Sequence, residues 1–190
     1  MRRVLKTALA GAAAIGLSTA ANAAVVLTSV NGPNLDTHIK ASTTNTQNDN
    51  AVVYGSTQND GQSADVTFTA NTAVHITDGA GFAAISDVDG GGLFTTITAD
   101  PTPNFSAYQF SIQLVDASYI LVQYSLDGVS FLNATAGDVT NPFQQNGSTL
   151  RDYQITANAG ESLSAIRVST CSTSACSAPG AGIFLFKQNS

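Results

Sequence analysis

Short segments in which apolar and polar residues alternate follow one another along most of the chain after residue 24. Alternation with a period of two residues places successive side chains on opposite faces of an extended strand, so it indicates β-strands with one buried face. Apolar residues at helical spacing are nearly absent. The pattern predicts about ten to twelve short strands, with segments at residues 24–30, 51–54, 65–69, 73–77, 82–88, 93–98, 108–114, 119–124, 129–132, 150–156, 165–169 and 183–186.

Turn-forming residues separate many of these segments. Asp127-Gly128 lies between two of the predicted strands, and Asn146-Gly147 precedes another. An Asp-Gly pair in such a place predicts a type I′ hairpin, because both central residues of that turn need a positive φ. Many short strands joined by such turns predict an all-β domain, and we expect an antiparallel two-sheet β-sandwich that is jelly-roll-like.

The first 23 residues have the three parts of a secretory signal peptide. Three basic residues occur within positions 1–6, an apolar run covers 7–17, and Ala21-Asn22-Ala23 has the small-x-small pattern of a cleavage site. We expect cleavage after Ala23, which leaves a single domain at 24–190. An uncleaved membrane anchor is the alternative, but polar residues interrupt the apolar run. The expected localisation is therefore secreted or periplasmic.

Without that segment the chain is acidic. Four basic residues remain beside thirteen acidic ones, which gives a formal net charge of −9. This balance disfavours binding to nucleic acids and to anionic membrane surfaces. Apolar residues make up 43% of the sequence, which is enough for a folded domain. The composition therefore predicts a folded protein with no nucleic-acid partner, and with no membrane association once the leader is removed.

Cys171 and Cys176 are the only cysteines, with four residues between them. In an oxidising compartment an even pair predicts a disulfide. Two cysteines without a nearby histidine are too few ligands for zinc, and redox-active pairs usually have two intervening residues. We therefore expect a structural disulfide between Cys171 and Cys176.

The residues needed for hydrolytic catalysis are scarce. His38 and His75 are the only histidines, Glu161 is the only glutamate, and no Gly-x-Ser-x-Gly segment is present. A Ser-His-Asp triad needs one of the histidines as its base, and glycoside hydrolysis needs two carboxyl groups. No spacing in the sequence points to either arrangement, so we expect no catalytic residues and no enzymatic activity.

The best candidate for metal binding is Asp87-Val88-Asp89, which three glycines follow. Asp87 and Asp89 would lie on one side of an extended segment, and the glycines would let backbone carbonyls turn inward. Calcium takes about six to eight oxygen ligands, so we consider it a possible cofactor at Asp87 and Asp89. An ordinary turn is the alternative, because glycine and aspartate are also typical of turns.

Two stretches, 93–111 and 160–167, resemble the exported β-domains of PEP-CTERM proteins, as does the alanine-rich leader. The resemblance implies a protein of envelope and exopolysaccharide biology. The chain ends at Phe186-Lys187-Gln188-Asn189-Ser190, without the Val-Pro-Glu-Pro motif, hydrophobic tail and terminal basic residues of that family. This departure implies a free rather than an anchored protein.

Together these features predict an exported, non-catalytic protein of the envelope or extracellular matrix that acts through binding or structural contacts. Its expected partners are polysaccharides or envelope proteins. The first alternative is a carbohydrate-binding module with a structural calcium, and exposed Tyr or Phe side chains on one sheet face would favour it. The second is a secreted hydrolase, and a cleft that holds His38 or His75 beside a serine, or two close carboxylates, would favour that.

Overall fold

The computed structural model describes residues 25–32, 38–41, 50–58, 65–79, 82–88 and 94–188, and these residues form an all-β protein, as the sequence predicts. They make fourteen strands: β1 (Val26–Val30), β2 (His38–Ala41), β3 (Asn50–Gln58), β4 (Asp65–Gly79), β5 (Phe82–Asp87), β6 (Thr96–Thr102), β7 (Ala107–Leu114), β8 (Ser118–Ser125), β9 (Leu132–Asn133), β10 (Thr135–Ala136), β11 (Phe143–Gln145), β12 (Arg151–Thr156), β13 (Ala165–Cys171) and β14 (Ile183–Gln188). No helix that is long and apolar enough to cross a membrane occurs in these residues.

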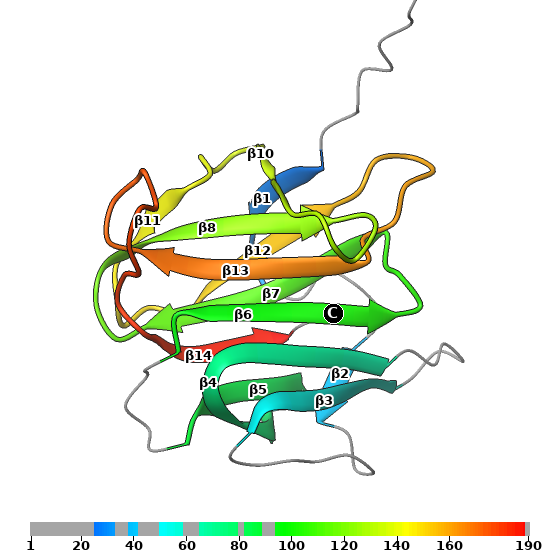
Figure 1. Cartoon of the computed structure of the whole chain (residues 1–190), viewed down its shortest axis with the longest axis horizontal. Helices are drawn as coiled ribbons and strands as arrows, with labels where there is room; N and C mark the ends of the chain where they lie inside the picture. The colour runs from blue at the N-terminus through cyan, green and yellow to red at the C-terminus, as the bar shows by residue number, and fades with distance from the viewer. Residues whose placement is uncertain are drawn as a thin grey trace, which may run out of the picture.

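Hydrogen bonds link the strands into one continuous sheet. Its order is β10-β1-β12-β7-β14-β5-β4-β6-β13-β8-β11, with β3 also paired to β4, β2 paired to β3, and β9 paired to β8. The sheet curls until it is nearly closed, so that β8, β13 and β6 lie in front of β12, β7 and β14 (Figure 1). We call these facing parts the β13 half and the β7 half. Because one sheet runs through both halves, the prediction of two separate sheets is not confirmed.

Strand β4 makes the first corner at which the sheet passes from one half to the other. Residues 65–70 of β4 pair with β6, whereas residues 74–79 pair with β5. The sequence pattern predicts two strands here, but no glycine or proline separates them, and the chain continues as one bent strand. Asn71 lies at the bend, where its side-chain oxygen accepts hydrogen bonds from the backbone N–H groups of Thr95 (2.8 Å) and Thr96 (2.9 Å). The bend is thereby tied to the start of β6.

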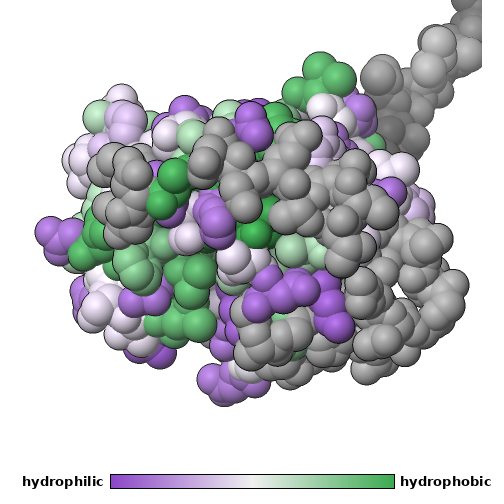
Figure 2. All heavy atoms as spheres, turned by 90° about the horizontal axis from the view of Figure 1, so that it is seen from below, coloured by the Kyte–Doolittle hydropathy of each residue, from purple (hydrophilic) through white to green (hydrophobic). Residues whose placement is uncertain are grey.

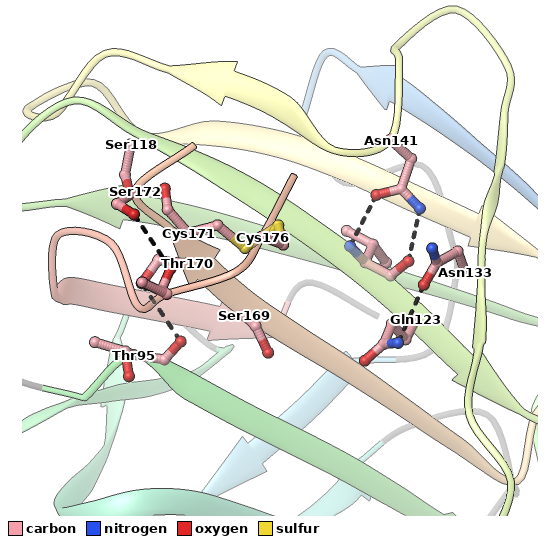
Figure 3. The surroundings of a disulfide bond; sticks show 12 residues. Thr95, Ser118, Gln123, Asn133, Asn141, Ser169, Thr170, Cys171, Ser172 and Cys176 are labelled. Atoms are coloured by element: carbon pink, nitrogen blue, oxygen red, sulfur yellow. Dashed lines mark hydrogen bonds between the residues drawn. A yellow bond between two sulfur atoms is a disulfide. The ribbon is translucent and has the colours of Figure 1, made fainter. Parts of the chain in front are cut away.

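Strands β9 and β10 make the second corner. β9 pairs with β8 and β10 pairs with β1, while Ala134 between them donates its backbone N–H to Val122 O over 3.0 Å. Beside this bond the side chain of Asn141 takes the place of a neighbouring strand (Figure 3). Its Oδ1 accepts from Val122 N over 3.0 Å, and its Nδ2 donates to Val122 O and Ala134 O, over 2.7 Å each. Asn141 thus satisfies the backbone of β8 between its pairings with β9 and β11.

Aromatic side chains pack between the two halves. Phe110 of β7 stacks on Phe186 of β14, with 5.5 Å between the ring centroids, and lies 5.8 Å from Tyr153 of β12. Phe186 in turn meets Phe68 of β4, and Tyr153 meets Phe143 of β11. All five rings are buried, and each such pair stabilises the core by about 0.5–1.5 kcal/mol beyond its buried area. The inner faces are therefore committed to packing, which leaves the outer faces as candidate sites.

Candidate functional site

The outward-facing side chains of β6, β13 and β8 form a polar surface that we call the β13 outer face. It consists of Thr96 and Thr98 of β6, Arg167 and Ser169 of β13, and Leu121 and Gln123 of β8. In the strand register Arg167 lies between Thr98 and Gln123. Ser169, two residues further along β13, lies between Thr96 and Leu121. Gln123 Nε2 donates to Asn133 Oδ1 of β9 over 3.1 Å (Figure 3). Residues that are distant in the sequence therefore present hydroxyl, amide and guanidinium groups on one surface.

Arg167 is the one basic residue of this face. Its Cζ lies 3.7 Å from the centroid of the Phe131 ring, and its Nε donates to Thr98 Oγ1 over 3.4 Å. Within the described residues its side chain has no further partner and no ion pair with a carboxylate. A guanidinium that stacks on an aromatic ring is held in one orientation, while its terminal N–H groups can still donate hydrogen bonds. The face therefore holds an oriented positive charge.

The loop between β8 and β9 supplies the ring beneath this guanidinium, and Asp127 organises the loop. Its Oδ1 accepts hydrogen bonds from Ser130 N (2.7 Å), Val129 N (2.8 Å) and Ser125 Oγ (2.8 Å). The backbone N–H of Ser130 first, then that of Val129 and the Ser125 hydroxyl, hold the pKa of Asp127 well below its usual range. The ionised carboxylate is thus the form that this loop favours.

The same loop corrects the prediction of a type I′ hairpin at Asp127-Gly128. Gly128 has a φ of +77°, but Asp127 is not in the positive-φ region, and a type I′ turn needs both. Pairing between the strands ends at Tyr124 and Leu132, so the connection is a longer loop. The predicted antiparallel hairpin is confirmed, and only its turn type was wrong, because a side chain that accepts three hydrogen bonds can hold a longer loop without a tight turn.

A disulfide between Cys171 and Cys176 closes the loop that follows β13, as the sequence predicts, with 4.8 Å between the Cα atoms. An open hollow of about 260 Å³ lies between this loop and the β13 outer face, near the disulfide that Figure 3 shows. Five of its ten lining residues carry hydroxyl groups: Thr95, Thr96, Ser169, Thr170 and Ser177. Thr170 is buried and its Oγ1 donates to Thr95 O over 3.4 Å, so the other four residues present the hydroxyl groups that can donate hydrogen bonds to a ligand and accept them from it.

Hydrogen bonds hold the disulfide loop in place as one wall of the hollow. Ser172 N donates to Ala178 O over 3.0 Å, and the buried Ser118 Oγ donates to Cys171 O over 2.8 Å. Gly180 packs so closely here that an added Cβ would lie 2.6 Å from the carbonyl carbon of Cys171, so this position requires glycine. The wall is thus fixed by backbone bonds as well as by the disulfide.

The described residues do not bring together the groups that the hydrolase alternative would need. His75 of β4 lies opposite Ser86 of β5, but no hydrogen bond joins the two side chains. Glu161 accepts a hydrogen bond from Asn158 Nδ2 over 2.9 Å within a turn. The side chain of His38 lies outside the described part. No group of three or more His, Cys, Asp or Glu side chains that could hold a metal ion occurs in the residues that the structure describes.

The calcium prediction at Asp87 and Asp89 stays a prediction. Asp87 is the last residue of β5 and is only 8% exposed, and it follows the inward-facing positions of Ala83 and Ile85. Asp89 lies outside the described residues. Asp87 therefore occupies an inward-facing position at the end of a strand, whereas the sequence suggests an open loop.

Exposed aromatic side chains are scarce on the described surface, where Phe184 alone among the aromatic residues is exposed. Seen from below, apolar surface occurs in separate areas between hydrophilic residues (Figure 2). The most exposed large apolar side chain is Val129, 81% exposed in the loop between β8 and β9. The described residues therefore do not gather exposed aromatic side chains on one sheet face, and Phe131 meets the β13 outer face as the partner of Arg167.

Sequence reasoning missed the β13 outer face as a site, because Arg167 counted there only toward the net charge. Alternation in β13 and β6 indicates which side chains share a face of each strand. It does not indicate which strands are neighbours, and Arg167 pairs with Thr98, 69 residues away. The sequence did contain one signal of this surface, the polar residues at outward positions such as Arg167 and Ser169. That signal does not indicate which strands lie on either side of β13.

The protein-family models contain none that matches this chain. Neither the curated proteins nor the solved structures include a significant match. The candidate site is therefore interpreted from its own geometry and chemistry.

Proposed function

We propose that this chain is an exported, non-catalytic protein of the envelope or extracellular matrix, and that it binds a polar ligand at the β13 outer face. The observation that carries the proposal is the hollow of about 260 Å³, with the hydroxyl groups of Thr95, Thr96, Ser169 and Ser177 in its lining and the disulfide loop as its wall. A disulfide fits an oxidising compartment, which agrees with export by the amino-terminal leader.

Carbohydrate binding is the form of this proposal that the hollow favours. Serine and threonine hydroxyls match the hydroxyl groups of a sugar as donors and acceptors, and the amide of Gln123 can pair with them as well. Side chains that project from paired strands are positioned more exactly than side chains on a free loop. The lack of an exposed aromatic platform among the described residues argues for recognition by hydrogen bonds more than by ring stacking.

The finer description of the fold is part of the same proposal. The two facing halves and the aromatic core between them support a jelly-roll-like sandwich, while the continuous pairing through β4 favours a single nearly closed sheet. In either description the β13 outer face points away from the core and is free to meet a ligand.

Thermal unfolding of the purified protein tests the proposal. Neutral and acidic polysaccharide fragments are added in turn, and a fragment present at about a hundred times its dissociation constant adds about 2.7 kcal/mol, or several degrees in Tm. Ser169→Gln, which fills the hollow, should abolish the shift. Ser174→Gln, the same change at an exposed residue of the disulfide loop outside the hollow's lining, should retain it.

Two results would reject the proposal in different ways. If no fragment shifts the Tm, or if Ser169→Gln leaves the shift intact, the hollow is not a carbohydrate site. If new reducing ends appear during incubation, the protein is a hydrolase instead. The same melts with calcium and with EDTA test the Asp87 and Asp89 prediction independently, because a calcium site would raise the Tm without any saccharide.

A further inference from the structure

The geometry points to a carboxylate-bearing saccharide, such as an oligouronate, as the class of ligand that the β13 outer face selects. Arg167 would pair with the carboxylate, and the adjacent hydroxyl and amide groups would bind the sugar ring. The inference rests on the binding function proposed above and names its substrate class. It begins from Arg167, a residue that neither the core nor any ion pair of the described residues uses.

The charge of Arg167 is unusual in its setting. The chain after residue 23 carries four basic residues against thirteen acidic ones, so a positive group would readily find a carboxylate partner. Asp100 lies two positions beyond Thr98 on the same side of β6, yet within the described residues no ion pair joins it to Arg167. The protein thus keeps one cation without an ion pair on this surface, although Asp100 lies on the same side of β6.

The orientation of Arg167 is also set in advance. Stacking on Phe131 at 3.7 Å holds the plane of the guanidinium, and the bond from Nε to Thr98 Oγ1 uses one N–H. The two terminal nitrogens keep the paired N–H groups that match a carboxylate in a two-point contact. Because little side-chain freedom is then lost on binding, the contact favours affinity as well as selectivity.

The surroundings of Arg167 favour a saccharide over a simple anion. Ser169 lies two residues along β13 on the same face and lines the hollow, and its Oγ accepts from Thr96 Oγ1 over 3.2 Å. Gln123 of β8 lies beside Arg167, on the side opposite Thr98 of β6. A ligand with one carboxylate and several hydroxyl groups would engage all of these groups at once, whereas an isolated anion would engage only the guanidinium.

Isothermal titration calorimetry of the purified protein tests the inference with tetragalacturonate and with cellotetraose, a neutral tetrasaccharide. Tetragalacturonate should bind at least about tenfold more tightly than cellotetraose. Arg167→Gln should lower the affinity for tetragalacturonate by about tenfold or more, because hydrogen bonds to charged groups are among the stronger ones. Arg167→Lys, which keeps the charge but loses the two-point geometry, should fall between the two.

Arg151→Gln is the matched control. It removes the same charge from an exposed residue of β12, in the β7 half, and should change the affinity by less than about twofold. An equal loss in Arg151→Gln would show a general charge effect and overturn the inference. Equal binding of both tetrasaccharides, insensitive to Arg167→Gln, would overturn it while the proposed binding function stands. Failure of tetragalacturonate to bind while cellotetraose still shifts the Tm would overturn it in the same way.

Discussion

Two outward surfaces of the sheet carry the same kinds of side chain and differ in what covers them. On the β7 half, the β7 outer face consists of Gln109, Ser111 and Asp152. Gln109 is 0% and Ser111 is 1% exposed, although both point away from the core. Gln109 Nε2 donates to Gly32 O, Ser111 Oγ donates to Asp152 Oδ1, and Gly32 N donates to Asp152 Oδ2. The chain that follows β1 is thus bound onto this face.

The β13 outer face is covered only in part among the described residues, where Phe131 packs on Arg167 and the disulfide loop borders the hollow at Ser169. Arg167, Ser169 and Gln123 are half-buried, and Ser169 lines an open hollow. A polar group that is buried must be paired by the protein itself, because leaving it unpaired costs about 1–3 kcal/mol. A polar group on an open face is satisfied by water and stays available to a ligand. The comparison teaches that a polar surface is not by itself a binding site. Whether its side chains can bind a ligand depends on whether other parts of the chain cover them and already form their hydrogen bonds.

The largest expected effect is at the edge of the β13 half. Asn141→Ala removes the partner of Val122 N and Ala134 O and one of the two donors to Val122 O, so it should lower the free energy of unfolding by roughly 3–5 kcal/mol in urea titrations. Asn133→Ala removes one exposed hydrogen bond, to Gln123, and should cost less than about 1 kcal/mol. Similar losses in the two variants would mean that Asn141 does not substitute for a strand.

The comparison of the two faces is tested directly by a pair of aspartates. Asp152→Ala removes the acceptor of Ser111 Oγ and Gly32 N on the β7 outer face, and should lower the free energy of unfolding by roughly 2–3 kcal/mol. Asp100→Ala, at an exposed position of β6, should change it by no more than about 0.5 kcal/mol. If Asp152→Ala and Asp100→Ala shifted the denaturant midpoint equally, coverage by other parts of the chain would not distinguish the two faces.

Loss of the disulfide should have the next largest effect. Replacing Cys171 and Cys176 together with alanine removes a short closed loop and should lower the free energy of unfolding by about 2 kcal/mol. Because Ser172 and Ala178 remain joined by a backbone hydrogen bond, the sheet itself should persist in circular dichroism spectra. Collapse of the β-signal would show that the loop is needed for more than the wall of the hollow.

Two buried tyrosines of the β7 half test whether the hydrogen bonding of a buried polar group determines its effect on stability. Tyr153 OH donates to Gln145 Oε1 over 3.0 Å, whereas the buried hydroxyl of Tyr108 has no partner among the described residues. Burial raises the pKa of Tyr153 to about 12 and raises that of Tyr108 as well. Tyr153→Phe should cost about 1–2 kcal/mol, and Tyr108→Phe should be neutral or stabilise by up to about 1 kcal/mol. The opposite order in thermal melts would contradict this dependence on hydrogen bonding.

The smallest effect concerns the loop that supports Phe131 and depends on pH. Folding lowers the pKa of Asp127, so its ionised form contributes stability above the unfolded pKa, and this contribution is lost as the pH falls toward the folded pKa. The Tm advantage of the wild type over Asp127→Asn should therefore be complete at pH 7 and shrink from about pH 5 to pH 2. An advantage that is constant across this range would show that the charge of Asp127 has no part in the loop.

Local pattern was sufficient for the strands and for their buried sides. Tyr108, Phe110 and Ile112 alternate along the predicted strand at 108–114, and all three side chains are buried in β7. The disulfide could also be predicted, because the sequence has two cysteines and its first residues predict export to an oxidising compartment. These features depend on a two-residue period or on composition, and both are properties of the chain that need no knowledge of its neighbours.

Pairing between distant segments could not be read in the same way. The bend that keeps β4 in one piece depends on Asn71 meeting Thr95, and the shape of the β8–β9 loop depends on the hydrogen bonds that Asp127 collects. Each of these contacts joins a short polar side chain to backbone donors, and many asparagines and aspartates in the sequence could form such bonds. Packing of the whole sheet selects among them.

The sequence by itself thus determined an all-β chain, its buried side chains, its acidic charge and its cysteine pair. The tertiary structure decided that β13 lies between β6 and β8, that Gly32 covers Gln109, and that Arg167 stands without a carboxylate partner among the described residues. The physical reason is that alternation sets which side of a strand is buried, whereas strand order and the cover of outer faces follow from burying all the inner faces together.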